Sequence, residues 1–174
     1  MRLKKETAQL CRMAFLCALA LSLSALESVF TPILPPGAKA GISNVVTMYA
    51  AACLGLPSAL VVVVVKAVFA LVTRGVVAFL MSLVGGLFSA VLLFFLFRCA
   101  RGKLGVIGIS VLGAVTHNVA QGLFSLVIFG RAMLGYLPIL IFLSLPSGVL
   151  TGSALFATLG ILHRKERNEE HSKK

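Results

Sequence analysis

Long apolar stretches separated by short polar segments are the main pattern along the chain. The apolar stretches cover residues 13–30, 42–54, 58–72, 76–97, 104–129 and 134–162. A helix needs about 20 mostly apolar residues to cross a hydrocarbon core of about 30 Å. The pattern therefore predicts an all-α integral membrane protein with six transmembrane helices.

The second and third stretches are shorter than a full span. Only Gly55, Leu56 and Pro57 separate them. They form either one kinked segment or a hairpin that does not fully cross the membrane. We favour the hairpin, because proline is well suited to the first turn of a new helix.

Composition supports a membrane protein: 59% of the 174 residues are apolar and 12% are charged. Such a chain does not suit a soluble domain. The two ends are too short to bury a core of their own. We therefore expect a basic N-terminus over residues 1–12, a six-helix transmembrane domain over 13–162 and a charged tail over 163–174.

Basic residues indicate the orientation. Of the 16 Lys and Arg residues, 12 fall within segments 1–12, 98–103 and 164–174, whereas Lys39, Arg74 and Arg131 fall on the opposite side. The positive-inside rule then predicts that both termini are cytoplasmic. The net charge of +11 is mostly a topology signal, and we expect no nucleic-acid partner, because no stacking-aromatic or recognition-helix pattern accompanies it.

Acidic residues are too few for carboxylate chemistry. The chain has no Asp, and among its five Asp and Glu residues only Glu27 lies in or near the membrane. It also lacks the spacing of a Walker A nucleotide-binding loop. We therefore expect no catalytic residues, no metal and no cofactor, and an ATPase on another chain if transport uses ATP.

Small and polar residues share one face of the fourth stretch. Ser82, Gly85, Gly86 and Ser89 follow an i, i+3, i+4, i+7 spacing. Such a face either packs tightly against another helix, which is the commoner role of such stripes in membranes, or lines a ligand site.

The fifth stretch carries three strong hydrogen-bonding side chains. His117 and Gln121 share a face, and Asn118 lies beside it. Because such groups are costly in lipid, they face protein, water or a ligand. We favour a substrate-binding cavity, although a purely interhelical network remains an alternative.

Charged and polar residues also gather at the outer ends of the first three stretches. They are Glu27, Lys39, Asn44, Thr47, Lys66 and Arg74. The single acid among several cations predicts an ion pair of Glu27 with Lys39 or Lys66. At least one cation would then remain for an anionic solute.

The run "PILPPGAKAGISNVVTMYA", followed by "SLVGGLFS", "AVTHNVAQ", "YLP" and "GVLTG", resembles the Gx transporter family, whose members are often labelled heptaprenyl diphosphate synthase component I. The resemblance covers nearly the whole chain. The opening loop departs conservatively from the family pattern at Ala40, Ser43 and Val45.

This family is similar in size and six-helix layout to the substrate-binding S components of energy-coupling factor (ECF) transporters. The resemblance implies an S component in the bacterial cell (inner) membrane that captures a small vitamin-like or precursor molecule, and that works with a transmembrane coupling subunit and two cytoplasmic ATPases. We expect the substrate-binding residues to be Glu27, Lys39, Asn44, Arg74, Ser82, Ser89, His117, Asn118 and Gln121. In the first stretch Ala14, Ala18 and Ser22 resemble the Ala-x-x-x-Ala docking motif of S components.

Two other functions compete with this interpretation. A membrane subunit linked to isoprenoid diphosphate synthesis would match the family label, but a chain without Asp cannot form the Asp-rich Mg²⁺ sites of prenyl elongation. A membrane scaffold without a solute predicts that His117, Asn118 and Gln121 pack against another helix with no cavity.

Overall fold

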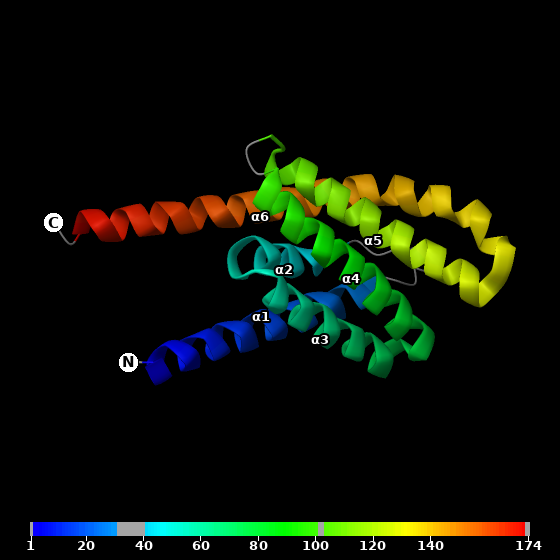
Figure 1. Ribbon diagram of the computed structural model, residues 1–174, viewed down its shortest axis with the longest axis horizontal. Coiled ribbons are helices and arrows are strands. Elements are labelled where there is room, and N and C mark those ends of the chain that lie inside the picture. The colour runs from blue at the N-terminus through cyan, green and yellow to red at the C-terminus, as the bar shows by residue number, and fades with distance from the viewer. Residues whose placement is uncertain (1, 31–40, 101–102, 173–174) are drawn as a thin grey trace.

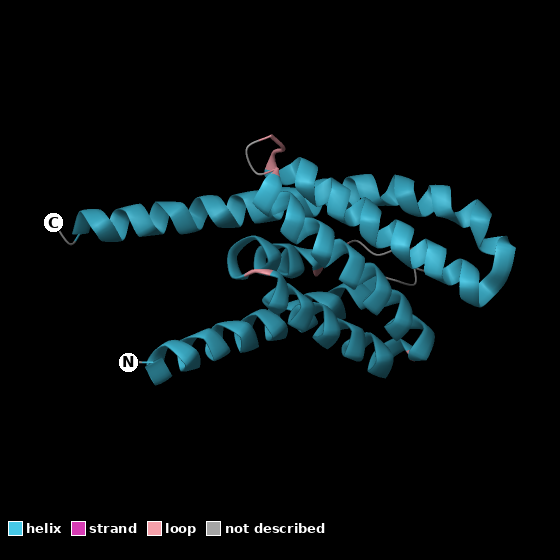
Figure 2. Cartoon of the chain, viewed as in Figure 1, coloured by secondary structure: helices cyan, strands magenta, loops and turns pink. Residues whose placement is uncertain are grey.

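The computed structural model describes residues 2–30, 41–100 and 103–172 (Figure 1). This part of the chain is helical and contains no strand (Figure 2), which confirms the all-α prediction. Its elements are α1 (Arg2–Phe30), α2 (Asn44–Tyr49), the π-helix η2 (Ala50–Leu54), α3 (Leu56–Arg74), α4 (Val76–Cys99), α5 (Val106–Phe129), the 3₁₀-helix η3 (Gly130–Tyr136) and α6 (Leu137–Ser172).

Five helical segments of the described chain are long and apolar enough to cross a membrane. They are Glu6–Val29, Leu56–Arg74, Val76–Cys99, Val106–Phe129 and Met133–Ile161. Their mean hydropathy ranges from 1.5 to 2.5. The chain is therefore a multi-pass membrane protein by the length and composition of its helices.

The six-span prediction is not confirmed, because the second apolar stretch is too short. It forms the six-residue α2 and the five-residue η2, which together rise about 16 Å, roughly half of the hydrocarbon core. The chain then turns at Gly55 and begins α3 with Pro57 in its first turn. The segment α2–η2 and helix α3 therefore form a hairpin that turns at Gly55 rather than one continuous helix.

The short segment α2–η2 lies at the centre of the bundle. Helix α2 contacts α1, α3, α4 and α6, and its side chains Val46, Thr47 and Met48 are buried. The long helices pack in the order α1, α3, α4, α5 and α6, each against the next. The described ends of α1 and α6 project from the same end of the bundle (Figure 1).

Helices α5 and α6 approach each other closely through glycine. A Cβ atom at Gly148 would lie 2.6 Å from the Cα atom of Val111, and one at Gly152 would lie 2.8 Å from the Cα atom of Ile107. Ser110 and Thr151 join the same helices through their hydroxyls, 2.7 Å apart. Small residues are the usual means of close helix contact in lipid, where apolar burial alone does not drive association.

We predict that Gly148→Ala destabilises the protein by about 1 to 3 kcal/mol, because the added methyl group forces α5 and α6 apart. Thermal unfolding of the detergent-solubilised protein, followed by circular dichroism, measures this effect. Gly160→Ala is the matched control, since a Cβ there meets no atom within 4 Å. Equal unfolding midpoints for both variants would contradict the prediction.

Candidate functional site

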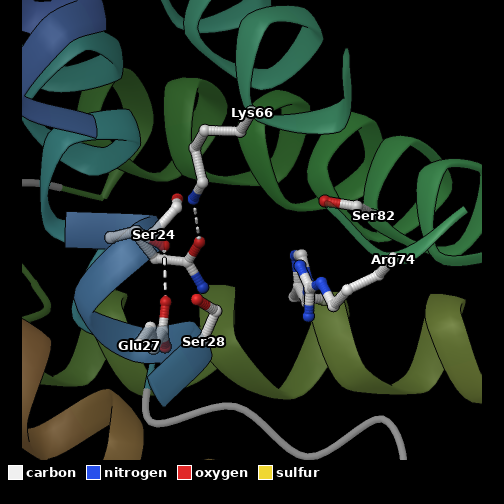
Figure 3. A pocket seen from close by; sticks show the side chains of 9 residues that line it. Ser24, Glu27, Ser28, Lys66, Arg74 and Ser82 are labelled. Atoms are coloured by element: carbon white, nitrogen blue, oxygen red, sulfur yellow. Dashed lines mark hydrogen bonds between the residues drawn. The ribbon is translucent and has the colours of Figure 1, made fainter. Parts of the chain in front are cut away.

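A polar cavity lies near the last turns of α1 and α3, which are away from the chain ends in Figure 1. Figure 3 shows side chains that line it. The last turns of α1, the start of α2, the second half of α3, the first half of α4 and the middle of α5 contribute to it. Its lining residues are Ser24, Glu27, Ser28, Ser43, Asn44, Lys66, Arg74, Ser82 and His117.

A second cavity continues from the first along α2 and α4. Both cavities share Asn44, Lys66, Ser82 and His117, and the second adds Thr47, Val63, Gly86, Ser89 and Leu93. Each has a volume of about 20 Å³, which is room for about one water molecule. The site is therefore nearly closed in this conformation, and a larger solute requires its walls to separate.

Glu27 is buried, with 5% of its surface exposed, and it joins α1 to the entrance of α2. One carboxylate oxygen accepts the backbone N–H of Gly41, and the other accepts the Ser43 hydroxyl at 2.8 Å. Hydrogen bonds to an ionised group are stronger than neutral ones. Glu27 thus holds the start of the central segment against α1.

Gly41 suits this junction for two reasons. Its φ angle of +78° favours glycine, and a Cβ there would lie 2.1 Å from the Ser147 hydroxyl oxygen of α6. The junction therefore brings α1, the start of α2 and α6 together, and a side chain at position 41 has no room.

Lys66 points into the cavity and donates a hydrogen bond to the Asn44 side-chain oxygen at 2.7 Å. The Glu27 carboxylate also attracts it electrostatically, and Arg74 repels it. The sequence predicted that Glu27 pairs with Lys39 or Lys66. Lys66 is attracted by the Glu27 carboxylate but donates its hydrogen bond to Asn44. Lys39 lies outside the described residues. Arg74 is exposed at the end of α3, about 12 Å along the helix from Lys66.

The small-residue face of α4 packs against neighbouring helices, and its serines line the cavities. A Cβ at Gly85 would lie 2.9 Å from the His117 carbonyl oxygen, and one at Gly86 would lie 2.6 Å from a Val63 methyl carbon, so both glycines are needed for packing. Ser82 lines both cavities. Ser89 lines the second and donates to the Gly113 carbonyl at 2.9 Å.

The three polar side chains of α5 predicted to line one site lie in different surroundings. His117, 7% exposed, lines both cavities. Asn118 instead donates to the Leu140 carbonyl of α6 at 3.1 Å, and Gln121, 3% exposed, is not among the residues that line either cavity. Asn118 therefore matches the interhelical interpretation, and His117 the cavity interpretation.

Sequence reasoning missed two serines of α1. Ser24 and Ser28 line the cavity beside Glu27, as Figure 3 shows. Residues spaced by three and four positions share a helix face, so the Ser24, Glu27, Ser28 spacing could have identified both. The predicted substrate-binding residues also did not include Lys66, although it lines both cavities.

The small residues of α1 lie on its outward face. Ala14, Ala18 and Ser22 are all exposed, whereas Leu16 and Ala20 are buried against the bundle. At about 100° per residue, these two sets lie on opposite sides of the helix. The outward strip is therefore accessible to lipid or to another helix.

The family comparison agrees with the resemblance found in the sequence. The sequence profile of the family described as heptaprenyl diphosphate synthase component I matches residues 16–158. The chain therefore belongs to this family, also called the Gx transporter family. No curated protein and no solved structure matches the chain significantly.

We predict that Glu27→Gln lowers the stability of the protein by about 1 to 3 kcal/mol, because the neutral amide has one acceptor oxygen for two buried donors. Thermal unfolding in detergent measures the change. Glu6→Gln, at an exposed position of the same helix, is the control and leaves the midpoint unchanged. If Glu27→Gln also leaves it unchanged, the carboxylate does not hold α1 to α2.

Proposed function

We propose that this protein is the substrate-binding S component of an ECF-type transporter that takes up a small vitamin-like or precursor molecule. In this proposal the chain is not an enzyme. It binds the solute, while a separate transmembrane coupling subunit and two cytoplasmic ATPases supply the energy for transport.

The observation that carries the proposal is the cationic polar cavity inside an apolar bundle. Ionisable groups at membrane depth are costly and mark solute or ion pathways more often than they serve packing. Here Lys66 and Arg74 face the same small space as one carboxylate, three serines of α1 and α4, and His117.

The outward strip of α1 supports a coupling partner. Ala14, Ala18 and Ser22 form a shallow exposed surface, and the larger exposed residues Phe15 and Leu19 lie beside it. Strips of this kind allow two helices to approach closely in lipid. We infer that the coupling subunit docks here.

The distribution of basic residues supports an orientation with both termini in the cytoplasm of a bacterial cell. The cavity lies in the opposite half of the bundle. In this orientation the cavity faces the outer side of the bacterial cell (inner) membrane, where a solute to be imported arrives.

The family description favours a second candidate, a membrane subunit linked to isoprenoid diphosphate synthesis. Such a chain would need a partner to supply Mg²⁺ chemistry, because the sequence has no Asp and the described residues include no group of three or more His, Cys, Asp or Glu that could hold a metal. A soluble prenyl synthase that co-purifies with the chain would support this candidate instead.

We predict that Ala14→Leu combined with Ala18→Leu blocks co-purification with the coupling subunit and abolishes ATP-dependent uptake in cells, because the larger side chains keep the two helices apart. Pull-down of the membrane complex and uptake of the solute identified by mass spectrometry of the purified protein measure both effects. Binding of that solute to the isolated protein persists.

The matched control is Thr116→Leu combined with Ala120→Leu, which adds volume at the same spacing in an open apolar groove between α4 and α5. This control keeps both co-purification and uptake. If the α1 variant co-purifies and supports uptake like the wild type, the coupling subunit does not dock on this strip of α1. ATP-independent uptake by the chain alone in liposomes would identify a secondary carrier.

A further inference from the structure

The second cavity contains a buried hydroxyl that makes no hydrogen bond within the described chain. Thr47 lies on α2, is 4% exposed and lines this cavity, and its Oγ1 atom has no partner among the described residues. A buried polar group without a partner is destabilising, and folded proteins contain few of them. In a cavity wall, such a hydroxyl is suited to a polar group of a ligand.

The first cavity carries an excess of positive charge. Lys66 and Arg74 face it, and Glu27 is the acidic residue among its described lining. Both Glu27 oxygens already accept hydrogen bonds from Gly41 and Ser43. Two cations and one carboxylate therefore leave one excess positive charge among the described lining residues. Arg74 is exposed at the end of α3, so this charge is open to an anion that arrives from outside the bundle.

The two features belong to adjacent cavities that share part of their lining. Lys66, Asn44 and Ser82 line both cavities, and Arg74 stands about two helical turns from Lys66 towards the end of α3. Thr47 follows Asn44 by one turn on α2. Val63 and Leu93 provide the apolar walls around Thr47.

We propose that the solute is a small organic anion whose charged group binds Lys66 and Arg74 and whose apolar body carries a hydroxyl or carbonyl that reaches Thr47. This inference rests on the proposed solute-binding function and names the substrate class of the same site. Binding replaces the hydrogen bond from Lys66 to Asn44 with one from Lys66 to the anion. The flexible stem of lysine permits this movement while the two cavities merge.

Three matched probes test the two ends of the site separately. 4-Hydroxybenzoate carries the anion and the hydroxyl, 4-hydroxybenzamide lacks the charge, and benzoate lacks the hydroxyl. Dissociation constants are measured by calorimetry on the full chain in nanodiscs of neutral phosphatidylcholine. Purified protein without a coupling subunit is used, so the result does not depend on transport.

We predict that 4-hydroxybenzoate binds at least tenfold more tightly than 4-hydroxybenzamide, and that Lys66→Met removes this difference whereas Lys66→Arg retains most of it. A hydrogen bond to a charged group accounts for a factor of roughly ten to one hundred. Equal binding of the acid and the amide, or no binding of the acid, overturns the proposal.

Thr47→Val tests the inner end without endangering the fold. It removes a hydroxyl that has no partner among the described residues, so the unfolding midpoint stays equal or rises. We predict that it weakens 4-hydroxybenzoate about two- to tenfold and leaves benzoate unchanged. Thr158→Val, at an exposed position on α6, is the control and changes neither affinity.

If Thr47→Val weakens 4-hydroxybenzoate and benzoate equally, or weakens neither, the proposed contact between the solute hydroxyl and Thr47 is wrong. Repeating the measurement in phosphatidylglycerol nanodiscs separates a free anion from a lipid headgroup. Displacement of 4-hydroxybenzoate by this lipid would assign the cation site to lipid and overturn a soluble substrate. Tight binding of the neutral amide alone would reject the anion but retain a solute-binding S component.

Discussion

The structure depends on satisfying buried polar groups in surroundings that offer no water. The Glu27 carboxylate illustrates this constraint, because it accepts the Gly41 N–H and the Ser43 hydroxyl at the point where the chain enters the bundle for a second time. The segment α2–η2 is shorter than a full span, and the polar backbone at its start needs partners inside the protein. Glu27 accepts the Gly41 N–H there, and the backbone N–H groups of Asn44 and Val45 bond to the carbonyls of Gly41 and Ile42.

Glycine and serine set the distances between the helices around α2. Gly148 and Gly152 bring α6 onto the backbone of α5, and Gly85 brings α4 onto the backbone at His117. These contacts hold His117 and Ser82 on facing helices within one narrow space. Close packing and the small size of the cavity thus have the same origin, and opening the site requires movement of α2 or of flexible side chains such as Lys66.

The proposed solute-binding cavity and the proposed docking strip on α1 lie in different parts of the molecule and differ in polarity. The cavity half contains Lys66, Arg74 and Glu27, whereas the outward face of α1 presents small residues such as Ala14 and Ala18 to the exterior of the bundle. A solute that binds in one place and a partner that docks in another do not compete. This arrangement suits a subunit that binds a solute by itself and relies on another chain for energy.

The sequence by itself determined the membrane class, the helical fold and the family, because long apolar stretches in lipid have helices as their simplest solution and the match extends over residues 16–158. It also indicated Glu27, Asn44 and His117 as interior polar residues. Only the tertiary structure decided that Asn118 bonds to α6 rather than lining either cavity, and that Thr47 lines the second cavity. The helical period places residues on a face, but the neighbour that this face meets depends on the packing of the other helices. The short helix α2 takes part in that packing here, because it contacts α1, α3, α4 and α6.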